Sequence, residues 1–343
     1  VQAETADGDP RLGPTVFPAA LHLALDTDLS GEEVVRRARA HLDEVTDELG
    51  AAAAAYLGRG VRGDVPATIR EALDRVAQTR PHDTTVVDRA RATYADAVEA
   101  TRRLDLVTVH DDPVVVQVMP ESRRGVAVAY CDPPGPLEEG GTTAYAIAPT
   151  PAGWPAERVA SFYAEYNDAM LVDLSVHEGA PGHVVQLGHA RRYRGATRVR
   201  AVTASSSFAE GWAVHAEQLL AEAGHGGPAV RLQQLKMQLR MTINALLDAG
   251  VHAGEMTEGE ALDLMTGRGF QTEGEAVGKW RRALLTSTQL STYFTGYVEL
   301  RDLFADLAAA GRLSGSRPYD QVLAHGSPPP RHLRRLLGLS GGA

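Results

Sequence analysis

The chain has 343 residues, of which 34 are basic and 44 acidic, and its net charge of −10 argues against nucleic acid or an anionic membrane as the main partner. The single cysteine, Cys131, excludes an internal disulfide and a cysteine-rich zinc site. No run of apolar residues approaches the roughly 20 that cross a bilayer.

The first third of the sequence predicts helices. A capping-box pattern at Ser30–Glu33 opens a long amphipathic run that continues through Leu57. Further helical patterns cover Ala67–Thr79 and Thr85–Leu104. We expect these segments to form an N-terminal helical region over residues 1–110.

A short β-rich segment follows, over residues 112–149. It contains three runs rich in β-branched and aromatic residues, Val114–Met119, Val126–Tyr130 and Thr143–Ile147. A stretch rich in proline and glycine separates the last two runs. We expect a small antiparallel sheet just before the metal-site helix, with an exposed edge that can hold an extended substrate by strand addition.

The segment from Val176 to Gln186 says most about function. It places His177 and His183 around Glu178, and Glu210 follows about one helical hairpin later. A catalytic zinc ion, Zn2+, needs such borderline ligands, an open position for water and a carboxylate beside that water as base. The pattern therefore predicts a zinc-dependent hydrolase.

The spacing of the two histidines differs from the strict metallopeptidase pattern. In H-E-x-x-H the histidines are four residues apart and share one face of a helix. His177 and His183 are six apart, which on a straight helix would point them about 120° away from each other. Proline has no N–H for the helix ladder and glycine permits unusual dihedrals. We therefore expect a kink at Pro181–Gly182 that brings His183 back toward His177.

Helical patterns return from Pro155 and continue almost to the C-terminus. Capping-box patterns at Thr257–Glu260 and Thr272–Glu275 mark two helix starts. We expect metal-site helices over 155–312, which with the sheet make a catalytic region over 111–312. The tail, 313–343, is rich in Gly, Ser, Pro and Arg, and we expect it to be loosely ordered on one compact unit. The predicted helices after the histidines are Phe208–Glu222, Ala229–Ala249, Glu258–Thr266 and Glu273 to about Ala310.

Four motifs together resemble a known bacterial family. They are H-E-x-x-P-G-H-x-x-Q from His177, E-G-W-A from Glu210, D-x-x-x-H from Asp248 and Q-x-x-x-Y-x-x-G from Gln289. Their order is similar to that of the family of domain of unknown function 885 (DUF885), and the resemblance runs from about Leu23 to Leu303. That family looks like a distant relative of zinc metallopeptidases.

The resemblance implies a mainly α fold, a large helical zinc-metallopeptidase-like domain with a small sheet. It implies that His177, His183 and Glu210 are the metal ligands and that Glu178 is the base. His189, six residues after His183, is a competing ligand without a match in the family's motifs.

Later residues are candidates for polarising the scissile carbonyl. His252, Tyr293 and Tyr297 can each donate a hydrogen bond to a developing oxyanion. The alternative for a buried tyrosine is a hydroxyl tied to the backbone. Asp248 lies four residues before His252, and we expect it to orient that ring or a nearby arginine.

Four further side chains are candidates for supporting the ligands or the substrate. Gln186 can hydrogen-bond a ligand or the substrate, and Glu217 is either a partner of a ligand or an acid on the helix surface. Arg240 and Arg301 can bind a substrate carboxylate, with a structural salt bridge as the alternative.

The expected function is hydrolysis of an amide in a short peptide or aminoacyl small molecule, with zinc or another divalent metal as cofactor. Zinc would lower the pKa of a water toward about 7, and Glu178 would take its proton. The alternatives are a metal-dependent non-peptide hydrolase or lyase, or a non-catalytic binding protein that keeps the fold. The N-terminus lacks the plan of a signal peptide and an initiator Met, so we expect a cytoplasmic protein with a processed or truncated end.

Overall fold

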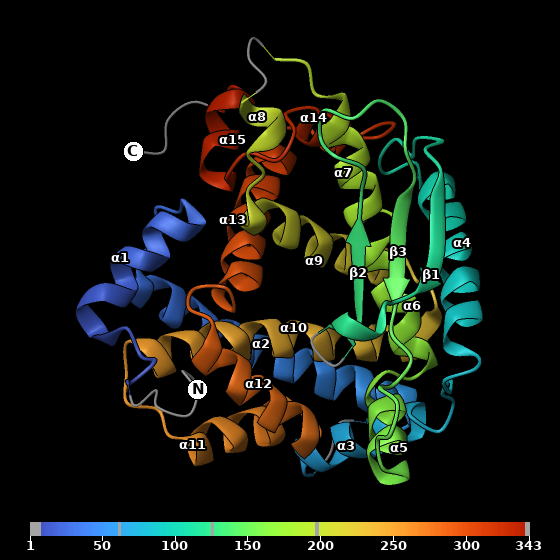
Figure 1. The fold of residues 1–343 in the computed structure, drawn as a ribbon, viewed down its shortest axis with the longest axis vertical. Helices are drawn as coiled ribbons and strands as arrows, with labels where there is room; N and C mark the ends of the chain where they lie inside the picture. The colour runs from blue at the N-terminus through green and yellow to red at the C-terminus, as the bar shows by residue number, and fades with distance from the viewer. Residues whose placement is uncertain (1–7, 61–62, 125–126, 196–198, 340–343) are drawn as a thin grey trace.

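The computed structural model describes residues 8–60, 63–124, 127–195 and 199–339 and shows a mainly helical protein with one small sheet (Figure 1). This confirms the predicted mainly α class. No helix within these ranges is long and apolar enough to cross a membrane. The helices are α1 (Gly13–Leu25), α2 (Gly31–Tyr56), α3 (Val65–Val76), α4 (Val86–Leu104), α5 (Ala156–Glu165), α6 (Asp168–Glu178), α7 (His183–Arg192), α8 (Val199–Val202), α9 (Ser206–Glu222), α10 (Gly227–His252), α11 (Glu258–Asp263), α12 (Glu273–Leu285), α13 (Ser291–Ala309), α14 (Asp320–Leu323) and α15 (Pro330–Leu336).

Capping residues explain where several helices begin. Ser30 accepts a hydrogen bond from the backbone N–H of Glu33 at the start of α2, while the Glu33 carboxylate pairs with two arginines instead of closing the predicted box. Thr257 and Glu260 form the complete reciprocal box at α11. Thr272 makes no side-chain cap, so the third predicted box is wrong.

The two longest helices, α2 and α10, lie side by side at the centre of the molecule (Figure 1). Their facing sides bury Leu42 and Leu49 from α2 and Leu239 and Ile243 from α10. Residues of α1, α3, α12 and α13 join the same core. The predicted N-terminal region and the predicted catalytic region therefore share one hydrophobic core, which removes their apolar faces from water together.

The sheet has the order β1-β3-β2, with β1 (Val114–Val118) parallel and β2 (Ala129–Asp132) antiparallel to β3 (Thr143–Ile147). The expectation of an antiparallel sheet is therefore wrong for one of the two strand pairs. The connection after β1, which includes a short 3-10 turn at Glu121–Arg123, carries the chain past the place that β3 later fills. As a result β2 is an edge strand, and it contacts α6.

The predicted long helix from Glu273 to about Ala310 is two helices, α12 and α13. The chain turns at Thr288, which has a positive φ of 65°. Asp248 of α10 accepts hydrogen bonds from the backbone N–H groups of Thr288 and Ser291, both at 3.0 Å. A cap supplied by a distant helix thus starts α13 at this point.

The expectation of a loosely ordered C-terminal tail is wrong for its described residues. Val322 and Leu323 of α14 and Leu333 of α15 are fully buried in a second core cluster that also holds Phe304 and Trp212. The Gly, Ser and Pro residues of this segment form turns between short helices, and those helices cover one end of the protein.

Candidate metal centre

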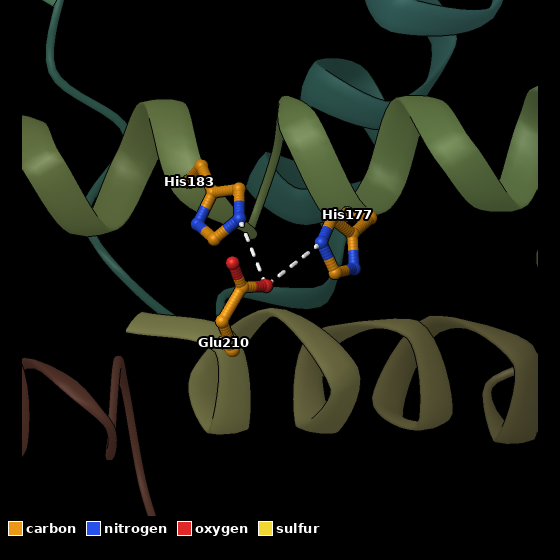
Figure 2. Close-up of side chains that lie close together, drawn as sticks. All are labelled: His177, His183 and Glu210. Atoms are coloured by element: carbon orange, nitrogen blue, oxygen red, sulfur yellow. Dashed lines mark ion pairs between the residues drawn. The ribbon is translucent and has the colours of Figure 1, made fainter. Parts of the chain in front are cut away.

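Three side chains converge between α6, α7 and α9 (Figure 2). One carboxylate oxygen of Glu210, Oε2, lies 3.4 Å from Nε2 of His177 and 3.6 Å from Nε2 of His183. Two donors about 2.1 Å from a tetrahedral zinc ion are ~3.4 Å apart, so these distances match those of ligands that share one ion. A tetrahedral ion held by three protein ligands keeps one position for water or substrate.

A break in the helix aims the two imidazoles at each other. The chain leaves α6 after Glu178 and enters α7 at His183, so the two rings come to 4.8 Å between centroids, at 86°. Gly182 is required here, because a Cβ at this position would overlap the backbone carbonyls of Val176 and His177. The break lies where Pro181–Gly182 predicted it.

The E-G-W-A motif at the start of α9 combines three separate contacts. Glu210 supplies the carboxylate of the site, while Gly211 packs against the backbone of Gly296 on α13. Trp212 is completely buried and donates a hydrogen bond from its ring nitrogen to the carbonyl of Pro181, at 2.8 Å. The motif therefore fixes the third candidate ligand and the helix break at the same time.

Glu217 supports His177 from behind. Its Oε1 lies 2.5 Å from Nδ1 of His177, and only 2% of Glu217 is exposed. By accepting the Nδ1 proton, Glu217 holds the neutral ring in the tautomer that leaves Nε2 free to bind a metal. Asp173, equally buried, lies close enough that burial and the Glu217 charge raise its pKa well above the usual range.

The electrostatics of the site follow from these contacts. Burial opposes the charged form of His177, but the carboxylates of Glu210 and Glu217 outweigh burial and raise the pKa of His177 well above its usual value. Burial likewise opposes ionisation of Glu210, yet the two imidazoles lower its pKa. Glu210 is therefore a carboxylate at neutral pH.

A buried polar atom tests whether the donor set fits a metal. Oε2 of Glu210 is inaccessible to solvent and, within the described residues, has no hydrogen-bond partner of acceptable geometry. An unsatisfied buried carboxylate oxygen is costly. Two imidazole nitrogens and one carboxylate oxygen around an open position are the donors that catalytic zinc takes. The residues present fit zinc.

Glu178 lies beside the three candidate ligands. It is 8% exposed, and burial raises its pKa although the neighbouring imidazoles oppose that shift. The backbone N–H of Cys131 in β2 lies against its carboxylate. A carboxyl group whose pKa is shifted toward neutrality can accept and return a proton, as a general base requires.

Tyr293 is the one predicted oxyanion donor that the structure brings to this site. It stands in the first turn of α13, and the nearby charge of Glu210 is the largest cause that raises its pKa, with burial next. The break between α12 and α13 determines where α13 begins, and so it determines where Tyr293, in the first turn of α13, lies.

The structure does not bring His252 to the three converging side chains. Its Nε2 lies 2.8 Å from the carbonyls of both Ala283 and Thr286, and its ring stacks on Phe17. These contacts tie the end of α10 to the end of α12, away from the ligands. Asp248 is 3.9 Å from His252, and its closer hydrogen bonds are those that cap α13.

Tyr297 and Arg301 also lie outside the site. The Tyr297 hydroxyl donates a hydrogen bond to Gln218 at 2.7 Å, and its ring packs beside His41 of α2. Arg301 lies over the Tyr297 ring. Tyr293 and Tyr297 lie on the same face of α13, one helical turn apart, so their difference comes from their position along the helix.

The remaining candidates have structural partners. Gln186 donates its amide N–H to Ser327 at 2.5 Å, not to a candidate ligand. Arg240 pairs with Glu275 at 2.8 Å, which is the salt bridge left open as its alternative. His189 lies 2.9 Å from the carbonyl of Thr108, outside the three converging side chains.

Three charged residues near the site were missed from the sequence. Asp173 precedes His177 by one helical turn, a spacing that could have drawn attention to it. Lys279 and Arg282, described below, carry no motif, and their positions depend on how α12 packs.

Comparisons with known proteins agree with the fold. A structure from Shewanella oneidensis, a candidate lipoprotein of unknown function, has a TM-score of 0.83 and 27% identity over 98% of this chain and 61% of that one. A candidate lipoprotein from Colwellia psychrerythraea has a TM-score of 0.78 and 18% identity over 96% and 57%. The chain thus spans about three fifths of the length of either protein, and its expected cytoplasmic location stays a prediction.

No curated protein matches the chain. A family model described as "Bacterial protein of unknown function (DUF885)" matches residues 1–337. The chain belongs to the DUF885 family.

Proposed function

We propose that the chain is a zinc-dependent hydrolase that cleaves an amide bond in a short peptide or an aminoacyl small molecule. One observation carries the proposal: the buried Oε2 of Glu210 faces the Nε2 atoms of His177 and His183 without a hydrogen-bond partner among the described residues, with Glu178 beside them. A buried carboxylate base next to three donors at the spacing of zinc ligands is an arrangement that suits metal-assisted hydrolysis of an amide.

His177, His183 and Glu210 would hold the ion. When bound, zinc supplies a Lewis acid that lowers the pKa of water and polarises a carbonyl oxygen. Glu178 accepts one proton from the attacking water, whose oxygen bonds to the carbonyl carbon. Glu178 then returns that proton to the amine nitrogen as the carbon–nitrogen bond breaks, so the proton count balances.

Tyr293 supports the same reaction from the opposite helix. A tyrosine hydroxyl is protonated at neutral pH, and Glu210 and burial raise the pKa of this one further. A hydroxyl that keeps its proton can donate a hydrogen bond to the carbonyl oxygen as negative charge develops there.

The sheet edge supports a peptide as substrate. β2 lies at the edge of the sheet, and the backbone of Cys131 in that strand lies against Glu178. An extended peptide that added to this edge would run past the base, with its main chain held by hydrogen bonds.

The deciding experiment compares Glu178→Gln with wild type. The zinc content of chelator-free protein and the hydrolysis of a short-peptide library are measured for both. We expect about one zinc per chain in each and loss of turnover by at least about a hundredfold in the variant, because a positioned base contributes 10²–10⁴-fold. Glu157→Gln, an exposed acid on α5, is the matched control and should leave turnover unchanged.

Two results would contradict the proposal. Absence of bound zinc in the wild-type chain after incubation with the ion would exclude the proposed zinc site. Zinc binding without hydrolysis of any peptide would favour a non-peptide reaction or a binding protein, and a panel of small esters and amides would separate those two.

A further inference from the structure

Helix α12 packs beside α10 (Figure 1), and charged side chains of these two helices and of α5 form a cluster. It contains four cations and two carboxylates. They are Lys236, Arg240, Lys279, Arg282, Glu165 and Glu275.

Two of the four cations are neutralised within the cluster. Lys236 pairs with Glu165 at 2.9 Å, and Arg240 pairs with Glu275 at 2.8 Å. Arg240 also receives support from the Tyr166 hydroxyl at 3.1 Å. Both carboxylates of the cluster are therefore paired with cations of α10.

Lys279 and Arg282 have no carboxylate partner among the described residues. Lys279 is 7% exposed, and no ion pair or hydrogen bond of its ammonium group lies within those ranges. Arg282 donates to the neutral amide oxygen of Gln289 at 2.7 Å. Burial, together with the neighbouring arginines, lowers the pKa of Lys279 well below its usual value and so favours its neutral amine until an anion binds. An anion bound beside Lys279 and Arg282 would offset the cost of charging the lysine, so the pair suits an anionic ligand.

The position of the pair links it to the metal centre. Lys279 and Arg282 are three residues apart and share one face of α12. Arg282 donates a hydrogen bond to Gln289, four residues before Tyr293 at the start of α13. The charges of Arg282 and Glu210 also act in opposite directions on the pKa of Tyr293, so the pair lies on the side of α12 toward the candidate metal centre.

We propose that Lys279 and Arg282 form a subsite that binds a carboxylate group of the substrate beside the candidate metal ligands. The inference rests on the proposed function for the reaction, but the binding step stands on these two cations alone. The carboxylate is either the free C-terminus of a peptide or an acidic side chain. A carboxylate fits because Arg282 offers a planar fork and Lys279 a point charge, which together can take one planar anion.

The test measures binding separately from turnover. Calorimetric titration of the zinc-free chain uses three probes: trialanine, trialanine amide, and the C-terminal amide of Ala-Glu-Ala. The zinc-free chain excludes direct coordination of the probe by the ion. We expect trialanine or the Glu-containing amide to bind about 10- to 100-fold more tightly than trialanine amide, as one charge-assisted hydrogen-bond pair provides. The probe that binds tells which carboxylate is recognised.

Variants then assign the preference to the two cations. Lys279→Met and Arg282→Gln should each remove the difference between acid and amide probes, and on turnover they should raise KM for the acid substrate with little change in kcat. Arg281→Gln, the exposed neighbour on α12, is the matched control and should keep the difference. Circular dichroism confirms that each variant is folded. If Lys279→Met unfolds, Arg282→Gln still tests the subsite, because its new amide remains a partner for Gln289.

The outcomes separate this proposal from the proposed function. Equal binding of all three probes to the wild-type chain overturns the subsite, even if peptides are hydrolysed. A preference for acid probes that survives in both variants also overturns it. A preference lost in both variants supports the subsite, even if no peptide is cleaved and the proposed reaction fails.

Discussion

Gly211 and Gly296 lie back to back where α9 crosses α13, so closely that a Cβ on either one would overlap backbone atoms of the other helix. For Gly211 the overlap is with Gly296 itself, and for Gly296 it is with the carbonyl of Ser207. The contact sits one residue from Glu210 and one turn from Tyr293, so the close crossing brings a candidate ligand and a candidate donor together.

Substitution of this contact should reduce stability. We expect Gly296→Ala to lower the free energy of unfolding by about 3 kcal/mol, because the added methyl group meets backbone that cannot move aside. Gly278→Ala is the matched control, since nothing lies within 4 Å of a Cβ there and alanine favours a helix by about 0.5–1 kcal/mol. Urea unfolding measures both variants. Equal free energies of unfolding for Gly296→Ala and Gly278→Ala would show that α9 and α13 can move apart without loss of stability.

Glu217 should control metal affinity without binding the metal. We expect Glu217→Gln to weaken zinc binding about tenfold, because it loses the negative charge that supports His177. Glu217→Ala should weaken zinc binding about a hundredfold, because it also loses the hydrogen-bond acceptor that orients the ring. Competition with a zinc chelator measures the affinity. Glu222→Gln, exposed at the end of the same helix, should bind zinc as wild type does. Unchanged affinity in Glu217→Ala would contradict the supporting role.

Zinc binding should release protons near neutral pH. The pKa of His177 is raised well above its usual 6.5 in the metal-free chain, so this ring holds a proton below that raised value. Zinc must displace it, and the apparent affinity should therefore rise with pH until His177 is neutral without the metal. Calorimetry in buffers of different ionisation enthalpy should count about one proton per zinc. A count of zero at pH 7 would mean that Glu210 and Glu217 do not stabilise the imidazolium.

Local patterns in the sequence were sufficient for most helices and for the three converging side chains. The motif from His177 to His183 carries its own break, because proline and glycine act on the backbone where they stand. Glu210 was identified by its motif, and the structure adds that Trp212 in the same motif holds the break through Pro181.

Contacts between distant segments explain what the sequence did not predict. Asp248 was expected to orient His252 or a nearby arginine, yet it caps α13 across 40 to 43 residues of chain. Without that cap in view, α12 and α13 read as one helix, and Tyr293 and Tyr297 could not be told apart. The strand order of the sheet and the packing of the tail likewise depend on tertiary contacts that outweigh local composition.

Tyr293 and Tyr297 form a matched pair that tests the site on one helix. Tyr293 is half-buried and Tyr297 is buried on α13; the charge of Glu210 raises the pKa of Tyr293, whereas Tyr297 donates its hydroxyl to Gln218. We expect Tyr293→Phe to lower kcat about a hundredfold with little change in stability, because it removes a donor to the developing oxyanion. Tyr297→Phe should keep kcat and lose about 1 kcal/mol of stability, the usual contribution of one hydrogen bond. Steady-state kinetics and urea unfolding of both variants check this. Equal kcat values would remove Tyr293 from the reaction as a donor to the oxyanion.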